Sequence, residues 1–217
     1  MSGKKVIAIG GNAGGMSTMS QLRRLDGEAE ISVFEKGTDI SYSACGIPYY
    51  IGGMIEEREQ LIARTPESFA EQRISVQTRH EVLKIDPEKR TLAIRDLRSG
   101  KEFSERWDML LVSTGAARPL PPIPGVDADG VFIVHSIDAA VQMRRWIENH
   151  APRRAVIVGG GSIGLEMADV FACMMGLDVT ILELAPQLMA VLDADMAVYV
   201  QEGLVAQGVK VHTGASV

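Results

Sequence analysis

Two short glycine-rich segments contain the residues whose spacing could do chemistry. The first reads Gly10-Gly11-Asn12-Ala13-Gly14-Gly15, and the second reads Gly159-Gly160-Gly161-Ser162-Ile163-Gly164. Each follows an apolar run typical of a buried strand and precedes a segment typical of a helix. Glycine lets the backbone turn sharply and approach an anion with no Cβ in the way, and the helix N-terminus offers free N–H groups to that anion. The two segments therefore predict two phosphate-binding turns.

An acidic residue follows each glycine segment at a similar distance. Glu35 comes 20 residues after Gly15, and Glu183 comes 19 residues after Gly164. Both acids end apolar runs, where a carboxylate can accept hydrogen bonds from ribose hydroxyls. A glycine turn with such an acid is the dinucleotide-binding fingerprint, and here it occurs twice. Two dinucleotides on one chain predict electron transfer between them.

Cys45 is the candidate redox side chain. It is followed by Gly46 and a short apolar stretch that predicts a helix start, where a thiolate is stabilised by the helix dipole. A buried structural cysteine is the alternative, and it stays open. Tyr50 stands where a dithiol reductase of this layout would need its second cysteine, so redox chemistry would run through one sulfur as a mixed disulfide, persulfide or sulfenate. Cys173 lies in an apolar helix end and is assigned to packing.

Composition limits the classes of function. The chain has 217 residues, 46% of them hydrophobic, a net charge of −6 and a pI near 5.3. This acidic balance argues against a nucleic-acid surface. No apolar run reaches transmembrane length and no export signal is recognised, so no membrane partner is expected. Two cysteines form no disulfide framework, which favours a reducing, cytoplasmic setting. No metal site is predicted.

The elements that must position these residues follow from apolar periodicity and turn signals. Strands are expected over residues 6–9, 31–35, 108–112, 155–158, 179–182 and 209–212, and helices over 14–25, 66–72, 137–149, 162–175 and 195–206. Thr65 is the expected N-cap of the second helix, with Pro66 in its first turn. Short strands separated by turns between residues 76 and 112 predict a small antiparallel meander inserted in a parallel sheet.

The resulting fold class is α/β, with two Rossmann-like parallel-sheet units and a small antiparallel meander. Four of the nine prolines fall between Arg118 and Gly125, which marks a stiff linker. The expected domains are a first dinucleotide-binding domain over 1–118, a linker and connecting helix over 119–150, and a second, truncated dinucleotide-binding domain over 151–217. The second unit has too few strands for a doubly wound domain. The chain is therefore expected to be the N-terminal part of a longer protein, the alternative being a naturally minimal second domain.

At this point the chain resembles the pyridine nucleotide-disulfide oxidoreductases, the flavoprotein family of glutathione reductase, along its whole length. The segment from Ser41 to Tyr49 is similar to the single-cysteine branch, which holds coenzyme A-disulfide reductases, persulfide or polysulfide reductases, and NADH oxidases and peroxidases. The oxidases and peroxidases usually carry a histidine where this chain has Ala13. The pair Pro48-Tyr49 also resembles the coenzyme A-disulfide and persulfide reductases.

The resemblance implies FAD in the first site and NADH or NADPH in the second. The residues implied to hold FAD are Gly10, Asn12, Ala13, Gly14, Gly15, Glu35, Lys36, Val82, Thr114, Gly115 and Ala116. Those implied to hold the nicotinamide cofactor are Gly159, Gly161, Ser162, Ile163, Gly164 and Glu183. Contacts to coenzyme A are implied for Ser17, Gln21, Arg24 and Ser41.

Two residues depart from the family pattern. Asn12 stands where the middle glycine of the fingerprint is expected, and asparagine tolerates unusual backbone angles better than most residues. Ala44 stands where an asparagine is usual before the cysteine.

The function implied is an FAD-dependent, NAD(P)H-driven reductase of coenzyme A disulfide, persulfide or polysulfide, with Cys45 as the catalytic residue. An NADH oxidase that reduces oxygen is one alternative. The other is a nucleotide-binding fragment, inactive without a C-terminal dimerisation domain. The parent protein is expected to be a homodimer with a small-molecule disulfide or persulfide as its substrate.

Overall fold

The computed structural model describes residues 3–116 and 120–217. These residues fall into two compact units. Unit 1 contains residues 3–43 and 62–116, and unit 2 contains residues 44–61 and 120–217. The predicted linker begins at Arg118 and Pro119, which lie outside the described residues. The expected assignment of an FAD-binding and an NAD(P)-binding domain stays a prediction.

Unit 1 is built on a four-stranded parallel sheet in the order β3-β2-β1-β7. The strands are β1 (Lys5–Ile9), β2 (Glu30–Glu35), β3 (Ile74–Thr78) and β7 (Met109–Val112). The helices α1 (Ala13–Leu25) and α3 (Pro66–Ala70) connect them. The expected strands and helices are therefore present. One expectation was wrong: residues 76–78 belong to β3, which pairs in parallel with β2 instead of joining the meander.

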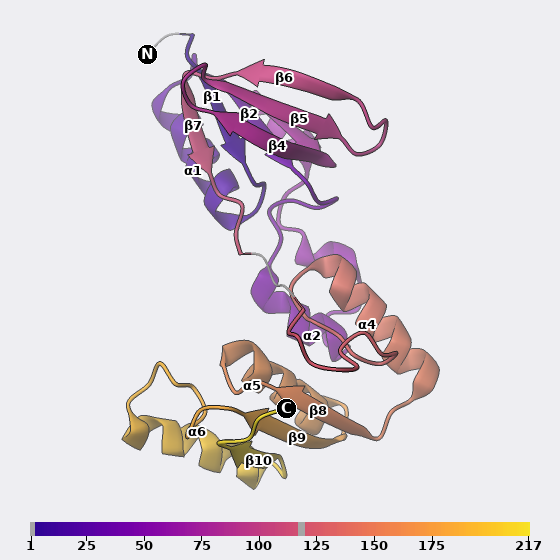
Figure 1. Cartoon of the computed structure of the whole chain (residues 1–217). Helices are drawn as coiled ribbons and strands as arrows, with labels where there is room; N and C mark the ends of the chain where they lie inside the picture. The colour runs from indigo at the N-terminus through magenta and orange to yellow at the C-terminus, as the bar shows by residue number, and fades with distance from the viewer. Residues whose placement is uncertain (1–2, 117–119) are drawn as a thin grey trace. The chain divides into compact units, whose positions relative to one another are not determined.

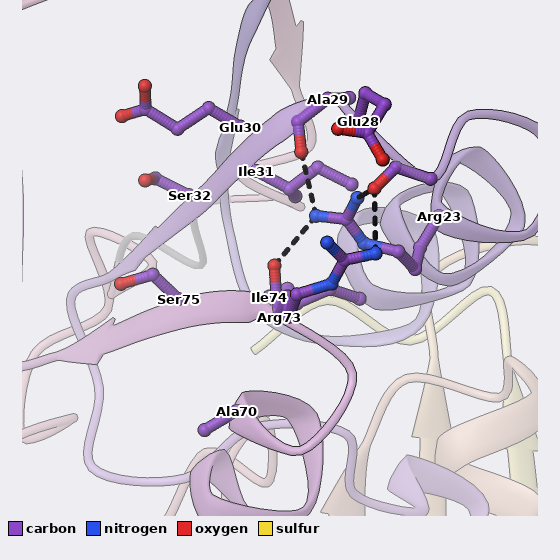
Figure 2. A pocket seen from close by; sticks show the side chains of 11 residues that line it. Arg23, Glu28, Ala29, Glu30, Ile31, Ser32, Ala70, Arg73, Ile74 and Ser75 are labelled. Carbon is purple, nitrogen blue, oxygen red and sulfur yellow. Dashed lines mark hydrogen bonds between the residues drawn. The ribbon is translucent and has the colours of Figure 1, made fainter. Parts of the chain in front are cut away.

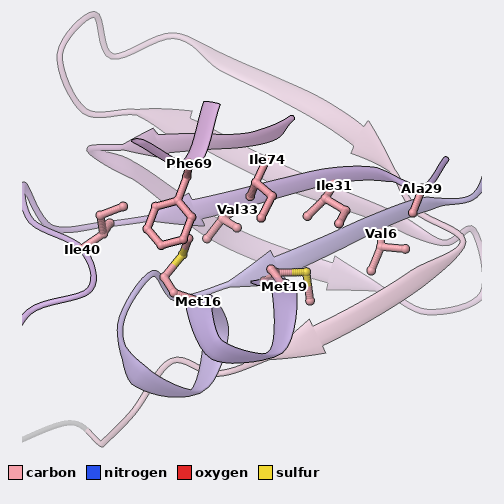
Figure 3. Close-up of a cluster of buried hydrophobic side chains, with 10 residues drawn as sticks. Val6, Met16, Met19, Ala29, Ile31, Val33, Ile40, Phe69 and Ile74 are labelled. Carbon is pink, nitrogen blue, oxygen red and sulfur yellow. The ribbon is translucent and has the colours of Figure 1, made fainter. Parts of the chain in front are cut away.

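One face of this sheet packs against α1 and α3 (Figure 3). Met16 and Met19 lie three residues apart on α1, so they share the helix face that meets the sheet. They contact strand residues that alternate along the sequence, and Phe69 of α3 closes the cluster. The strand side chains in this cluster are Val6, Ala8, Ile31, Val33 and Ile74.

The other face is covered by a three-stranded antiparallel sheet (Figure 1). Its strands are β4 (His80–Asp86), β5 (Thr91–Asp96) and β6 (Glu102–Arg106), which form the predicted meander. Ile7 and Ile9 point to this side of β1 because side chains alternate along a strand. They form a second buried cluster with Phe34, Leu92 and Ile94. Both faces of the parallel sheet in unit 1 are thus buried.

Unit 2 contains a three-stranded parallel sheet in the order β10-β9-β8. The strands are β8 (Arg154–Val158), β9 (Asp178–Glu183) and β10 (Lys210–Thr213), and the connections contain α5 (Ser162–Asp169) and α6 (Ala194–Ala206). The helix expected to run from 162 to 175 ends at Asp169 and continues as the π-helix η3 (Val170–Met174). On β8, Val156 and Val158 are 64% and 60% exposed.

Unit 2 also holds the segment that contains Cys45. This segment comprises η1 (Ala44–Gly46), α2 (Ile47–Ile51) and η2 (Arg58–Leu61), and α2 packs against α4 (Ile137–His150). Among residues 3–116 and 120–217, no helix is long and apolar enough to cross a bilayer.

Candidate functional site

The first glycine turn lies at the carboxyl end of β1. Gly10 has a φ of +105°, a conformation that disfavours any side chain, and its N–H donates to the Phe34 carbonyl oxygen at 2.9 Å. A Cβ on Gly10 would overlap the carbonyl oxygen of Ser113, and a Cβ on Gly15 would overlap that of Gly10. The turn is thus packed too tightly for a side chain at either position. Without side chains at these positions, the backbone of the turn can approach a pyrophosphate closely.

Glu35 ties this turn to the end of β2. Its carboxylate accepts the N–H of Gly11 at 2.7 Å and the N–H of Gly37 at 2.6 Å. A carboxylate offers about four acceptor positions, so two bonds leave capacity for ribose hydroxyls. A Cβ on Gly11 would lie 2.6 Å from Cγ2 of Ile40, so this glycine too is required by packing. The predicted ribose acceptor is therefore also a brace of the turn.

The second turn repeats this geometry in unit 2. Gly159 has a φ of +106°, and a Cβ on Gly164 would overlap the Gly159 carbonyl oxygen. Glu183 accepts the N–H of Gly160 at 2.5 Å and that of Ala185 at 2.6 Å. These bonds to Ala185 and Gly160 hold the pKa of the Glu183 carboxyl below its ordinary value. Glu183 is thus charged at neutral pH, as a ribose acceptor should be.

The helices that follow the two turns begin with open N-termini. Neither α1 nor α5 has a side-chain cap or an acidic residue in its first turn. By contrast, Thr65 and Ser136 cap α3 and α4 through their side chains, and both of those helices carry an acid in the first turn. The first-turn amides of a helix have no acceptor within the helix, and the N-terminus favours negative charge. Both turns therefore fit a bound phosphate group, as FAD and NAD(P)H require.

The remaining residues expected at the FAD site have defined places in unit 1. Lys36 forms an ion pair with Glu81 at 2.7 Å, and Val82 lies on β4 next to a break in the register with β5. Thr114, Gly115 and Ala116 follow β7 and are exposed. Their roles stay predictions, since they rest on the resemblance.

Three residues of the turns are missing from the predicted set. Gly11 and Gly160 donate to the two acids, and Ser113 borders the first turn through its carbonyl oxygen. The repeated Gly-Gly pair at the start of both segments was a signal for the glycines. Ser113 follows from the pairing of β7 with β1, which the sequence alone does not show.

The backbone explanation for Asn12 was wrong. Its φ of −104° and ψ of −152° are extended values that most residues adopt, so no unusual conformation selects asparagine there. Its side-chain oxygen instead accepts the N–H of Tyr42 at 3.1 Å.

Cys45 lies in η1 directly before α2, and its side chain is exposed. Tyr50, at the position of a second cysteine in dithiol reductases, is only 8% exposed and lies under the Arg144 guanidinium, 4.7 Å from the ring centre. Cys173 is exposed too, so its assignment to core packing was wrong. Partial desolvation and then the Asp169 carboxylate raise the pKa of the Cys173 thiol, which lowers its thiolate content at neutral pH.

The residues expected to contact coenzyme A lie in unit 1. Ser17, Gln21 and Arg24 are spaced so that they share one exposed face of α1. Arg24 donates to the Gln21 side-chain oxygen, so this pair is brought together. Ser41 adopts a left-handed φ of +47°, and its N–H donates to the Gly11 carbonyl oxygen at 2.9 Å.

A groove of about 550 Å³ lies in unit 1, away from the glycine turns (Figure 2). Residues at the start of β2 and β3 line this groove. Open α/β sheets instead bind ligands at the carboxyl ends of their strands. Arg23 donates to the carbonyl oxygens of Gly27, Ala29 and Arg73 at 2.8, 2.7 and 2.7 Å. Its charge is engaged by backbone, so Arg23 acts as a brace and the groove is not a candidate nucleotide site.

Similar proteins include both oxidases and sulfur reductases. An NADH oxidase of Methanocaldococcus jannaschii is 39% identical over 209 residues, which are 95% of this chain and 46% of the relative. A coenzyme A disulfide reductase of Staphylococcus haemolyticus is 35% identical over 195 residues, 89% of this chain and 43% of the relative. The chain thus spans less than half the length of these relatives.

Solved structures are also similar to this chain over nearly its whole length. The reduced CoADR-RHD of Bacillus anthracis matches with a TM-score of 0.94 at 35% identity, over 99% of this chain and 39% of that one. An NAD-dependent persulfide reductase from A. fulgidus matches with a TM-score of 0.90 at 34% identity, over 97% of this chain and 40% of that one. The family model described as pyridine nucleotide-disulphide oxidoreductase matches residues 4–217. With that match over nearly its whole length, the chain belongs to the pyridine nucleotide-disulphide oxidoreductase family.

Proposed function

We propose that the protein to which this chain belongs is an FAD-dependent, NAD(P)H-driven reductase of coenzyme A disulfide, persulfide or polysulfide. The observation that carries the proposal is the repeated glycine turn, each copy braced by its own acid, on a chain with one exposed cysteine before α2 and a tyrosine in place of its partner. FAD is assigned to the turn of unit 1 and the nicotinamide cofactor to the turn of unit 2.

FAD, when bound, supplies a carrier that takes a hydride from NAD(P)H and passes two electrons to sulfur. Cys45 supplies the nucleophile. Its thiolate attacks one sulfur of the substrate disulfide, so that a mixed disulfide forms and the first thiolate leaves. When two electrons cleave that mixed disulfide, Cys45 regains its thiolate and the second thiolate leaves. One NAD(P)H and one proton are consumed for each disulfide, and two thiols result.

Coenzyme A is the favoured thiol carrier. Arg24 offers a guanidinium fork that suits a phosphate, and its bond to Gln21 limits its rotamers. Ser17 lies on the same exposed face of α1, one turn before Gln21. Arg24→Ala in the longer protein should raise KM for coenzyme A disulfide and leave KM for a small disulfide unchanged.

Oxygen reduction is the second candidate, favoured by the 39% identity to an NADH oxidase. In that case Cys45 carries a sulfenate between turnovers. Ala13, where oxidases and peroxidases usually have histidine, favours the reductase. Oxygen uptake and thiol release, measured on one preparation, separate the two candidates. A third reading, a nucleotide-binding fragment, is tested by whether this chain alone purifies with bound flavin.

The decisive variant pair is Cys45→Ser and Cys173→Ser in the longer protein. Cys45→Ser should abolish disulfide reduction while FAD stays bound, because only the sulfur nucleophile is lost. Cys173→Ser is the matched control, since this thiol is also exposed, and it should keep wild-type turnover. Wild-type turnover in Cys45→Ser would exclude the proposed mechanism.

A further inference from the structure

The two nucleotide turns differ at one of the three fingerprint glycines. The fingerprint glycine is present at Gly161 in unit 2 but is replaced by Asn12 in unit 1. Both residues begin their helices from an extended backbone conformation, with φ of −82° and −104°. Backbone geometry therefore does not explain the asparagine, and its side chain must.

In both units, a residue that follows the acid in the sequence donates its backbone N–H to the glycine turn. Ser41 and Met189 both have a φ of +47°, and their N–H groups donate to the carbonyl oxygens of Gly11 and Gly160 at 2.9 and 2.8 Å. Unit 1 alone adds a side-chain bond, because Oδ1 of Asn12 accepts the N–H of the next residue, Tyr42. Glycine at 161 has no side chain with which to do this.

Tyr42 lies at the base of the excursion that contains Cys45. The Ala63 N–H donates to the Ser41 carbonyl oxygen at 2.9 Å, and Tyr42 forms an isolated antiparallel bridge with Ile62. The chain thus leaves unit 1 after Ser43 and re-enters it at Ile62, beside Tyr42. Cys45 follows Tyr42 by three residues. The Asn12 side chain fixes this base to the glycine turn.

We propose that Asn12 is a positioning residue. It stands in place of the fingerprint glycine, and its side chain anchors the entry of the Cys45 segment to the first nucleotide turn. The proposal rests on the proposed function in that it takes Cys45 as the reacting group. It adds a link, through one amide, between the first glycine turn and Tyr42, three residues before the proposed nucleophile Cys45.

The anchor itself is tested on this chain without cofactor or substrate. Asn12→Gly restores the fingerprint and removes the acceptor, whereas Asn12→Asp keeps an acceptor oxygen at the same place. In Asn12→Gly the Tyr42 amide should exchange about 3- to 10-fold faster with solvent, the range expected for one lost hydrogen bond, and Asn12→Asp should restore protection. In a Cys173→Ser background, the alkylation rate of Cys45 should move toward that of the urea-unfolded chain in Asn12→Gly only.

The catalytic consequence is measured in the longer protein, per bound flavin. Asn12→Gly should lower kcat for disulfide reduction by about tenfold or more, because small misplacements of a nucleophile are costly, while KM and the rate of flavin reduction by NADH stay unchanged. Unchanged Tyr42 exchange in Asn12→Gly would overturn the anchor, and unchanged kcat with faster exchange would overturn its positioning role. If the wild-type protein reduces no disulfide, the proposed function fails, while the exchange and alkylation results still decide on the anchor.

Discussion

At the residue scale, the two acids proposed as ribose acceptors also brace their own glycine turns. Glu35 and Glu183 each bind two backbone N–H groups, one in the glycine turn and one just beyond the strand that carries the acid. The carboxylate therefore shapes the phosphate-binding backbone before any nucleotide arrives. A substitution at either acid should affect both the ribose contact and the order of the turn.

Glu35→Ala should weaken FAD retention. The ribose loses a charged acceptor and the Gly11 N–H loses its partner, and one charge-assisted contact of about 1.5–3 kcal/mol corresponds to roughly 10- to 100-fold in affinity. Flavin content after dialysis is the measurement, with Glu88→Ala as the control because it removes an exposed carboxylate from the turn between β4 and β5 of the same unit. Equal flavin content in Glu35→Ala and wild type would contradict the assignment.

Glu183 should make unit 2 sensitive to acid. Its folded-state pKa lies below the ordinary 4.5 because the Ala185 and Gly160 amides stabilise the carboxylate. The unfolded chain therefore binds this proton more readily, so the stabilisation is complete above about pH 4.5 and is lost as pH falls through the lower folded-state pKa. Glu183→Gln should flatten the acid limb of a Tm-against-pH curve. The exposed Glu202→Gln is the control and should leave that limb unchanged.

Glu183 should also set cofactor choice. A 2′-phosphate on the adenosine ribose would face this carboxylate, and no Arg or Lys occurs between Arg154 and Lys210 to compensate for it. The longer protein should therefore show a higher kcat/KM with NADH than with NADPH. Glu183→Ala should narrow that ratio. A ratio in favour of NADPH, or one that Glu183→Ala leaves unchanged, would rule this role out.

At the element scale, one side chain of α4 binds the end of α2 and the turn that follows it. Arg144 donates from one guanidinium nitrogen to the carbonyl oxygens of Tyr50, Ile55 and Glu56 at 3.2, 3.0 and 2.9 Å. It also lies over the Tyr50 ring. Tyr50 lies in the last turn of α2, and Ile55 and Glu56 follow the helix, so the cation sits where the helix dipole favours positive charge. Arg144 thus links α4 to α2 and to the turn after α2, both of which follow Cys45 in the sequence.

Arg144→Ala should destabilise unit 2 by about 1.5–3 kcal/mol, the usual range for a hydrogen bond to a charged group. Amides of α2 and the following turn should exchange faster, above all those of Gly52 and Met54, which donate to Pro48 and Tyr49. Arg145→Ala is the matched control, because it removes the same charge from the exposed neighbouring position of α4. Equal amide exchange in the two variants would show that these Arg144 hydrogen bonds do not protect α2.

Sequence periodicity predicted most elements because their signals are local. The β1 run, the glycine turns and the Thr65 cap need only their own residues. The parallel pairing of β3 and the bond from Tyr42 to Asn12 depend on segments that are distant in sequence, so no local signal reports them. Cys173 was misassigned because an apolar run does not show which of its side chains face solvent. Cys173 follows the buried Phe171 by two residues, which places the two side chains on roughly opposite sides of the helical turn.

At the scale of the whole molecule, the two units share a plan but differ in how their sheets are covered. In unit 1, Ile7 and Ile9 precede the first glycine turn and are buried under the antiparallel sheet. The residues that precede the second turn at the same spacing are Val156 and Val158, and both are mostly exposed. These two lie on β8, which is also an edge strand of its sheet.

This chain on its own should therefore self-associate through β8. Exposed apolar side chains on an unpaired edge strand are a template for association. Sedimentation velocity should show a concentration-dependent shift to larger species, and the double variant Val156→Lys/Val158→Lys should suppress it. Because both side chains bury little surface, Tm should hardly change. Val191→Lys is the control, since Val191 is 86% exposed in a loop and its replacement should leave association intact. Association that persists in the double variant would place the contact on another surface.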